Sequence, residues 1–245
     1  MSLPVHQHPD LTEARIGDLI ELIGDEAHHA VAVRRLRVGE SVVLTDGRGT
    51  SVTGRITQTG KQALWLRADQ VRRDEQPSPS ITVVQAIPKG ERGELAVEVL
   101  TEIGVSRIVP WAASRSVAIW KGDRAEKSLA KWRGAAVQAA KQARRTWFPE
   151  VDSMQSTSGV LDLITASDVA IMLHEEAGRP LSSIDYSGRL LVVVGPEGGL
   201  SEDEVGSFET AGAVAVRLGE EVLRTSTAGV AAVAAILSRT SRWGA

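Results

Sequence analysis

The sequence LLVVVGPEGGL at positions 190–200, with its partner LGEEVLRTSTA at positions 218–228, decides the fold of this chain. Five apolar residues open the first stretch and three of them are β-branched, which is typical of a parallel strand buried on both faces. The glycines of GPEGG allow positive φ angles and a close approach of the backbone to a ligand. Ser201 and Glu204 have the spacing of a capping box, and Gly212 is placed to end the helix that they begin.

A second strand is expected at 213–218, followed by a loop and by a helix of small residues at about 225–239. Two strand–loop–helix units in series bring two loops to the carboxyl edge of a sheet, where open α/β sheets bind ligands. Neither dinucleotide-binding nor P-loop glycine spacing occurs in the chain, so a phosphate cradle is not indicated. The first loop suits a ligand that backbone groups recognise, such as a nucleoside. A tight strand-to-helix turn without a ligand is the alternative.

The composition narrows the class of protein. A length of 245 residues allows one large domain or two modest ones. The absence of cysteine excludes disulfides and thiolate zinc sites, and we expect no bound metal. The N-terminus lacks the pattern of a signal peptide, and the longest apolar stretch near the C-terminus, at 230–237, is too short to span a bilayer. We therefore expect a cytoplasmic protein without a membrane partner.

The organisation changes along the chain. Residues 1–75 are β-rich, with a turn signal at Asp46-Gly47 and short strands that suggest a small barrel. A polar linker with two prolines follows at 72–80. From position 81, strands at 81–87, 107–111 and 168–174 alternate with helices, which is typical of an α/β domain with a mostly parallel sheet. The sequence thus predicts two domains, at 1–75 and 76–245.

The charge is distributed unevenly along the chain. The net charge is −3, yet residues 121–149 hold 8 basic and 2 acidic groups. Lys127, Lys131, Gln138, Lys141 and Arg145 fall near one face of the helix predicted there. A basic stripe in an acidic chain favours contacts with phosphates, although a charge run is more often a solvated helix face. The cluster His28, His29, Arg34, Arg35 and Arg37 has the same two interpretations, phosphate contacts or a solvated turn with surface arginines.

The two C-terminal motifs carry a resemblance to a known family. GPEGGLSEDEV followed by LG-x-x-x-LR-x-x-TA resembles the signature of the RsmE-type 16S rRNA (uracil-N3)-methyltransferases, which belong to the SPOUT class. The similarity extends along nearly the whole chain. It includes matches to the family's PUA-like RNA-binding segment at His28, His29, Val33, Arg35, Gly39 and Glu40. Further matches are Lys89, Gly90, Glu102, Gly104, Val105, Ile108, Pro110, Gln142, Arg145 and Pro149, and a strand that ends in His174 and Glu175.

The resemblance implies a fold and an activity. The fold is a SPOUT α/β-knot domain with a mostly parallel sheet and a trefoil knot, preceded by a small PUA-like β-barrel domain. The reaction is transfer of a methyl group from S-adenosylmethionine to N3 of a specific uridine in 16S rRNA. The implied partners are the 16S rRNA of the 30S ribosomal subunit and a second copy of the chain in a homodimer.

The resemblance also assigns candidate residues. The cofactor would be bound, mostly through backbone atoms, by Leu173, Gly195, Pro196, Glu197, Gly198, Leu218, Gly219, Val222, Leu223, Thr225 and Ala228. Arg224 and Arg145 are candidate catalytic cations near the target phosphate or uracil oxygens. Glu197, Glu102 and His174 are possible proton acceptors, and the choice among them is open. RNA contacts are expected at His29, Arg34, Arg35, Arg37, Lys89, Lys127, Lys131, Lys141 and Arg145.

The chain departs from the family pattern at several positions. Arg34 stands where leucine is usual, and Val99 where lysine is often seen. Glu221 replaces an arginine of the second motif, and Ser226 replaces a glutamate that we predict to be dispensable. These losses make one alternative plausible, a non-catalytic SPOUT-fold RNA-binding or ribosome-assembly factor. A separate alternative is a SPOUT methyltransferase that acts on another RNA such as tRNA.

Overall fold

The structure, a computed structural model, describes residues 3–118 and 120–244 and divides into two compact units. The first unit comprises Met1–Gln76 together with Ala140–Phe148, and the second comprises Pro77–Ala139 and Pro149–Ala245. The sequence predicted one boundary near residue 75. The structure differs in that the segment Ala140–Phe148, which begins in the last turn of the basic helix, belongs to the first unit.

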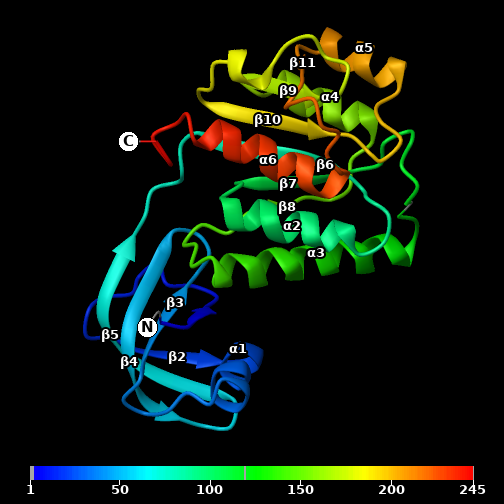
Figure 1. The fold of residues 1–245 in the computed structure, drawn as a ribbon. Coiled ribbons are helices and arrows are strands. Elements are labelled where there is room, and N and C mark those ends of the chain that lie inside the picture. Colours follow the sequence, from blue (N-terminus) through cyan, green and yellow to red (C-terminus); the bar gives the residue numbers. More distant parts are fainter. Residues whose placement is uncertain (1–2, 119, 245) are drawn as a thin grey trace. The chain divides into compact units, whose positions relative to one another are not determined.

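The second unit is built on a six-stranded sheet in the order β11-β9-β10-β6-β7-β8, in which every adjacent pair is parallel (Figure 1). Its strands are β6 (Ser80–Ala86), β7 (Arg107–Trp111), β8 (Glu150–Val151), β9 (Val169–Leu173), β10 (Arg189–Val194) and β11 (Val214–Val216). Its helices are α2 (Arg92–Ile103), α3 (Asp123–Gln142), α4 (Thr157–Thr165), α5 (Glu202–Thr210) and α6 (Thr225–Leu237), with a 3₁₀ turn at Leu181–Ser183. The predicted parallel α/β sheet is confirmed.

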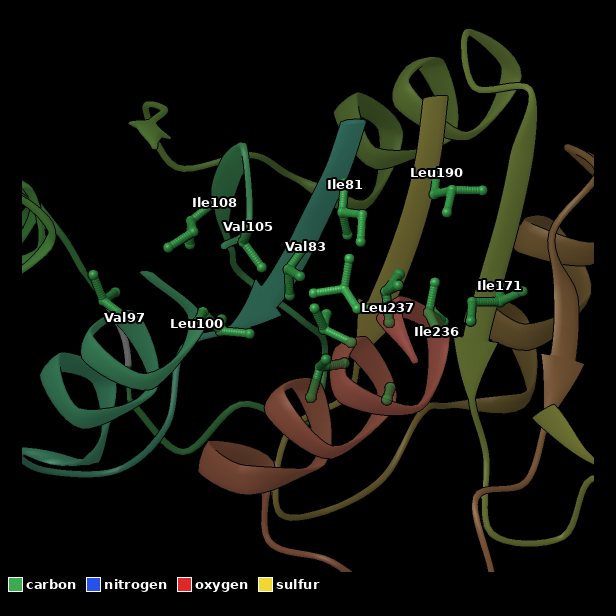
Figure 2. Packing of buried hydrophobic residues seen from close by; sticks show 14 of the residues in the cluster. Ile81, Val83, Val97, Leu100, Val105, Ile108, Ile171, Leu190, Ile236 and Leu237 are labelled. Atoms are coloured by element: carbon green, nitrogen blue, oxygen red, sulfur yellow. The ribbon is translucent and has the colours of Figure 1, made fainter. Parts of the chain in front are cut away.

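Strand β10 lies in the interior of this sheet. It pairs with β6 on one side and β9 on the other, and the five residues from Leu190 to Val194 are all buried. Their side chains point to alternate faces of the sheet, so helices must cover both faces. One core cluster packs the sheet against α2, α3 and α6, and the other packs it against α4 and α5. Figure 2 shows the first cluster, with Leu190 of β10 and Ile81 of β6 facing Ile236 and Leu237 of α6.

The predicted helix boundaries of this unit are confirmed where the sequence carries a capping signal. Ser201 caps α5, and the reciprocal hydrogen bonds with Glu204 complete a capping box. Gly104 ends α2 with φ of 103°, a left-handed conformation that costs glycine little because it has no Cβ. None of the helices in the described part of the chain is long and apolar enough to cross a membrane.

The first unit contains a five-stranded sheet in the order β1-β3-β4-β5-β2. The strands are β1 (Val5–Gln7), β2 (Leu19–Ile23), β3 (Ser41–Thr45), β4 (Thr50–Thr59) and β5 (Ala63–Arg73). β1 pairs with β3 in parallel, and the other pairs are antiparallel. The predicted hairpin is confirmed, since β3 and β4 pair antiparallel. In the turn, Asp46 Oδ1 accepts hydrogen bonds from the amides of Arg48 and of Thr50, the first residue of β4. β1 and β2 do not pair with each other, so the sheet is an open half-barrel.

A buried ionic cluster ties helix α1 (Gly24–His28) to the segment Ala140–Phe148 within the first unit. Glu26 accepts a hydrogen bond from Lys141 Nζ at 2.5 Å, and its other oxygen lies 3.3 Å from His6 Nδ1. The Lys141 side chain is only 8% exposed. The prediction that Lys141 contacts RNA is therefore wrong, because its ammonium group is buried against a carboxylate. A π-helical turn, His29–Val33, follows α1 directly.

Desolvation alone would raise the pKa of Glu26, but hydrogen bonds from His6 and Lys141 and the charge of Lys141 lower it to about 2. A carboxylate whose folded pKa lies below its unfolded value stabilises the fold above the unfolded pKa and loses that contribution as the pH falls. We therefore expect the first unit to lose stability as the pH falls through about 4.5 toward about 2.

The substitution Glu26→Gln tests this cluster. The amide keeps the shape but leaves the Lys141 ammonium buried without a counter-ion, which costs roughly 3–5 kcal/mol for a buried pair. We expect a lower melting temperature at pH 7 and a flatter dependence of melting temperature on pH in the acid range, both measured by circular dichroism. A variant as acid-sensitive as the parent would show that Glu26 is not the group responsible.

Candidate functional site

A cleft of about 970 Å³ opens at the carboxyl ends of β9, β10 and β11. It lies entirely within the second unit. Every residue predicted to bind the cofactor lines it: Leu173, Gly195, Pro196, Glu197, Gly198, Leu218, Gly219, Val222, Leu223, Thr225 and Ala228. The two sequence motifs, which are separated along the chain, therefore meet in one place, as the strand–loop–helix pattern predicted.

The glycine loop, residues 195–200, forms one wall of the cleft and leaves little room for side chains at two positions. A Cβ atom on Gly195 would lie 3.2 Å from Leu200 Cδ2, and one on Gly198 would lie 3.2 Å from the Cβ of Arg115. A hydrogen bond from the Gly199 amide to the Pro196 carbonyl closes the turn at 2.9 Å. The glycines thus let the backbone, rather than side chains, face the cleft.

Arg115 holds this loop from outside. Its Nη1 donates hydrogen bonds to the carbonyls of Gly198 and Leu200, at 3.3 and 3.0 Å. Arg115 lies in the segment that follows β7, and this segment is fixed in turn by Glu204, whose Oε1 accepts from the Ser114 amide at 2.8 Å. The predictions missed Arg115. Its position just after a strand of the sheet was the signal that could have identified it, because such loops gather at the same edge.

Glu204 is a buried carboxylate, 3% exposed, in the first turn of α5. Burial alone would raise the pKa of Glu204, but hydrogen bonds from the amides and side chains of Ser114 and Ser201 outweigh burial and lower it. The ionised carboxylate also lies near the helix N-terminus, where the backbone N–H groups favour a negative charge. Glu204 therefore fixes the start of α5 and the Arg115 segment together.

The second loop, residues 217–224, closes the other side of the cleft and runs into α6. Thr225 and Ser226 in the first turn of α6 are 6% and 5% exposed. The side-chain amide of Gln85, fully buried at the end of β6, donates to the Thr225 carbonyl at 3.2 Å. Of the two departures from the family motif, Glu221 is exposed in the cleft lining, whereas Ser226 is buried in the helix.

The candidate proton acceptors occupy different environments. Glu197 lines the cleft, and its Oε1 accepts from the Lys89 amide at 3.1 Å. His174 also lines the cleft, and its Nδ1 accepts from the Glu176 amide at 3.2 Å, so a neutral ring carries its proton on Nε2 and presents a donor. Glu102 is exposed at the end of α2 and does not line the cleft.

The two candidate catalytic cations belong to different units. Arg224 is the N-cap residue of α6, is exposed, and lines the cleft. A cation at a helix N-terminus is unfavourable for the helix, so its position there needs a reason other than helix stability. Arg145 belongs to the first unit and is not among the residues that line the cleft.

Acidic side chains outnumber basic ones around the cleft. The carboxylates are Glu175, Glu176, Glu197, Glu202, Glu209, Glu220 and Glu221, and the guanidinium groups are Arg92, Arg115, Arg217 and Arg224. Such a lining favours a ligand with a positive charge. Among the described residues, no cluster of three or more histidine or acidic side chains is arranged to hold a metal ion.

The residues predicted to contact RNA lie in both units. In the first unit, Arg34, Arg35 and Arg37 are exposed, whereas the half-buried His29 ring packs near His6 with centroids 5.9 Å apart. Burial chiefly lowers the pKa of His29, so its ring is poorly suited to carry a charge to a phosphate. In the second unit Lys89 and Lys127 are exposed, and Lys131 Nζ lies 3.9 Å from Glu94 Oε1 in an exposed pair.

The chain is similar to known proteins over nearly its whole length. Residues 74–237 match the model of an RNA methyltransferase domain, and residues 22–69 match that of an RNA methyltransferase PUA domain. Ribosomal RNA small subunit methyltransferase E of Mycobacterium bovis is 46% identical over 91% of this chain and 87% of that protein. The chain belongs to this family.

Other family members extend the comparison. The enzyme of the same name from Bacillus subtilis is 28% identical over 94% of this chain and 95% of its own. The crystal structure of ribosomal RNA small subunit methyltransferase E from Neisseria gonorrhoeae bound to S-adenosylmethionine has a TM-score of 0.88 at 30% identity, covering 97% of this chain and 98% of that one. The SPOUT-type fold with a preceding PUA-like domain is therefore confirmed, and the trefoil knot stays a prediction.

We predict that Arg115→Ala loosens the glycine loop. Loss of the charged donor leaves two carbonyls without their restraint, and a hydrogen bond to a charged group contributes about 1.5–3 kcal/mol before solvent screening reduces it. Amide hydrogen exchange at residues 197–200 should become roughly tenfold faster, with unchanged exchange in β10. Arg92→Ala, which removes another cleft arginine without touching the loop, is the control. Equal exchange rates in all three proteins would contradict the restraint.

Proposed function

We propose that this protein transfers a methyl group from S-adenosylmethionine to N3 of a uridine in the 16S rRNA of the small ribosomal subunit. One observation carries the proposal: both family motifs, at 195–200 and 218–228, line a single cleft within one unit. The cleft volume, about 970 Å³, is at the upper end of the range of small-molecule sites, which is about 300–1,000 Å³.

The residues present fit this cofactor. The gonococcal relative was crystallised with S-adenosylmethionine, and so was the Legionella pneumophila methyltransferase, which has a TM-score of 0.87 at 26% identity. In this chain, the glycine loop offers backbone groups without side-chain obstruction, and Leu173, Leu218 and Ala228 offer apolar surface beside it. The carboxylates of the lining favour the positive sulfonium group.

The bound cofactor supplies an already activated methyl group, so the chain's own residues have to orient the uracil and manage its N3 proton. We assign proton acceptance to Glu197, because Oε1 is held by the Lys89 amide and Oε2 receives no hydrogen bond from another described residue. His174 serves as a hydrogen-bond donor from Nε2. Arg224 provides a positive charge that stabilises the developing uracil anion.

The target base must leave any base pair, since N3 lies on its Watson–Crick edge. We infer that the first unit holds the surrounding RNA through Arg34, Arg35 and Arg37. We also infer two functional domains close to the predicted 1–75 and 76–245, one for RNA binding and one for methyl transfer. We also infer a homodimer in the cytoplasm acting on the 30S subunit. Two exposed apolar side chains on the second loop, Val222 at 75% and Leu223 at 41%, support a covering partner subunit.

The activity itself is tested by methyl transfer from tritium-labelled S-adenosylmethionine to small-subunit rRNA, small subunits and tRNA. We expect label in the rRNA, at N3 of uridine in a nucleoside digest, because the two motifs form one complete cleft. Label in tRNA alone would assign the enzyme to another RNA. No label in any of these substrates, with rRNA still bound, would instead support a non-catalytic assembly factor and would show that the loss of the family's glutamate at Ser226 matters.

Glu197→Gln separates proton acceptance from binding. The amide oxygen still accepts from the Lys89 amide, so the loop keeps its shape, but the side chain no longer takes up a proton. We expect kcat to fall about 10²-fold or more, with little change in cofactor affinity by calorimetry. Glu209→Gln, another carboxylate of the lining, is the matched control. A full kcat in Glu197→Gln would remove Glu197 from the chemistry.

A further inference from the structure

Two arginines of the first unit have backbone conformations that normally belong to glycine. In the described part of the chain, Arg35 and Arg144 are the residues other than glycine with positive φ, at 56° and 55°. The left-handed region is unfavourable for side chains because Cβ approaches the following carbonyl oxygen. Each residue terminates a helical segment, where glycine is the usual choice.

Local structure forces both conformations. At Arg35 the π-helical turn has ended, and the next residue, Leu36, must turn back to pack on the core of the unit. At Arg144 the chain leaves α3 through a hydrogen bond from the Arg145 amide to the Ala140 carbonyl, 2.9 Å long. The following residues are then fixed, since Thr146 Oγ1 and Trp147 Nε1 both donate to Asp74. Glycine would make either turn at a lower cost in stability.

Contacts within the fold do not explain why arginine occupies these positions. The side chains of Arg35 and Arg144 are exposed, and among the described residues neither forms a hydrogen bond or an ion pair. An exposed arginine in the left-handed region lowers the stability of the fold, and here its side chain makes no polar contact with the described residues that offsets this cost. A residue retained at such a cost points to a role for the side chain outside the folded chain.

The buried cluster around Glu26 joins the two helix ends. Glu26 belongs to α1, which runs directly into the π-helical turn that Arg35 follows. The same carboxylate binds Lys141, whose carbonyl accepts from the Arg144 amide at 3.1 Å. Beyond burial, the nearby His6, Lys141 and Arg34 lower the pKa of His29, and Glu26 opposes them.

We propose that Arg35 and Arg144 form a pair of phosphate-binding groups, each contacting the backbone of the substrate RNA, with Arg144 as an RNA contact that the motifs do not identify. This inference rests on the proposed function, because it takes rRNA as the occupant. Charge complementarity favours a polyanion, and guanidinium groups bind phosphate oxygens in a fork geometry. The arginines position the RNA backbone and carry no sequence specificity.

The test uses glycine substitutions, because they separate the effect of each arginine on the stability of the fold from its effect on RNA affinity. Arg35→Gly and Arg144→Gly remove a charge and also relieve the backbone, so we expect melting temperatures that are unchanged or raised by roughly 2–4 °C. Affinity for 16S rRNA transcribed in vitro, measured by filter binding, should fall about 3- to 10-fold for each variant. The slope of log affinity against log salt should flatten by about 0.7–0.9 for each arginine.

Two further variants serve as controls. Arg144→Lys keeps the charge but loses the guanidinium fork, so it should bind RNA more weakly than the wild type but more tightly than Arg144→Gly. Lys61→Gln removes one positive charge at the exposed turn between β4 and β5 and should leave RNA binding unchanged. Wild-type affinity and salt dependence in Arg144→Gly would overturn the proposal, and so would an equal loss in Lys61→Gln, which would reveal an effect of net charge alone.

Methyl transfer by the wild-type protein distinguishes this inference from the proposed function. If the wild type methylates rRNA while Arg35→Gly and Arg144→Gly bind RNA as it does, only the phosphate pair is wrong. If the wild type fails to methylate any RNA but the glycine variants lose RNA affinity, the pair stands as an RNA-binding site, and the proposed reaction fails.

Discussion

The burial of β10 on both faces is the constraint on which the second unit depends. Its residues from Leu190 to Val194 have no solvent-facing side, so the strand requires parallel neighbours and helices above and below it. Parallel strands linked by helices all point the same way. The loops that follow β9, β10 and β11 therefore emerge at one edge, and the cleft is the space between them. The site exists because of how the strand is buried.

The glycine-rich loop needs restraints that keep it in one conformation, because glycine loses more conformational freedom on ordering than any other residue. The structure provides them from outside the loop. Arg115 bonds two of the loop's carbonyls, and the buried carboxylate of Glu204 fixes both the segment that carries Arg115 and the start of α5. On the opposite wall, Gln85 holds the first carbonyl of α6. Contacts within the second unit thus restrain both walls, and such restraint lowers the entropy cost of binding a ligand.

The sequence predicted the elements that neighbouring residues determine. It missed the contacts between residues that lie far apart in the sequence. The apolar run at 190–194, the capping box at Ser201 and the stop at Gly104 are short-range signals, and each is confirmed. Lys141 was misplaced because helical periodicity shows which residues share a face but not what covers that face. Here the cover is Glu26, more than a hundred positions away. Arg115 was missed for the same reason, since its partners follow a different strand.

The charges of the cleft limit how RNA approaches it. Its carboxylates suit a cationic cofactor but repel the phosphates that flank a target base. At physiological ionic strength this repulsion fades over about 8 Å, so it acts only on phosphates brought close to the rim. A base turned out of its helix enters the cleft ahead of its own backbone, and the flanking phosphates then need support away from the carboxylates. Under the proposed function, Arg34, Arg35 and Arg37 of the first unit would provide such support, and Arg224 in the cleft lining would meet the base itself.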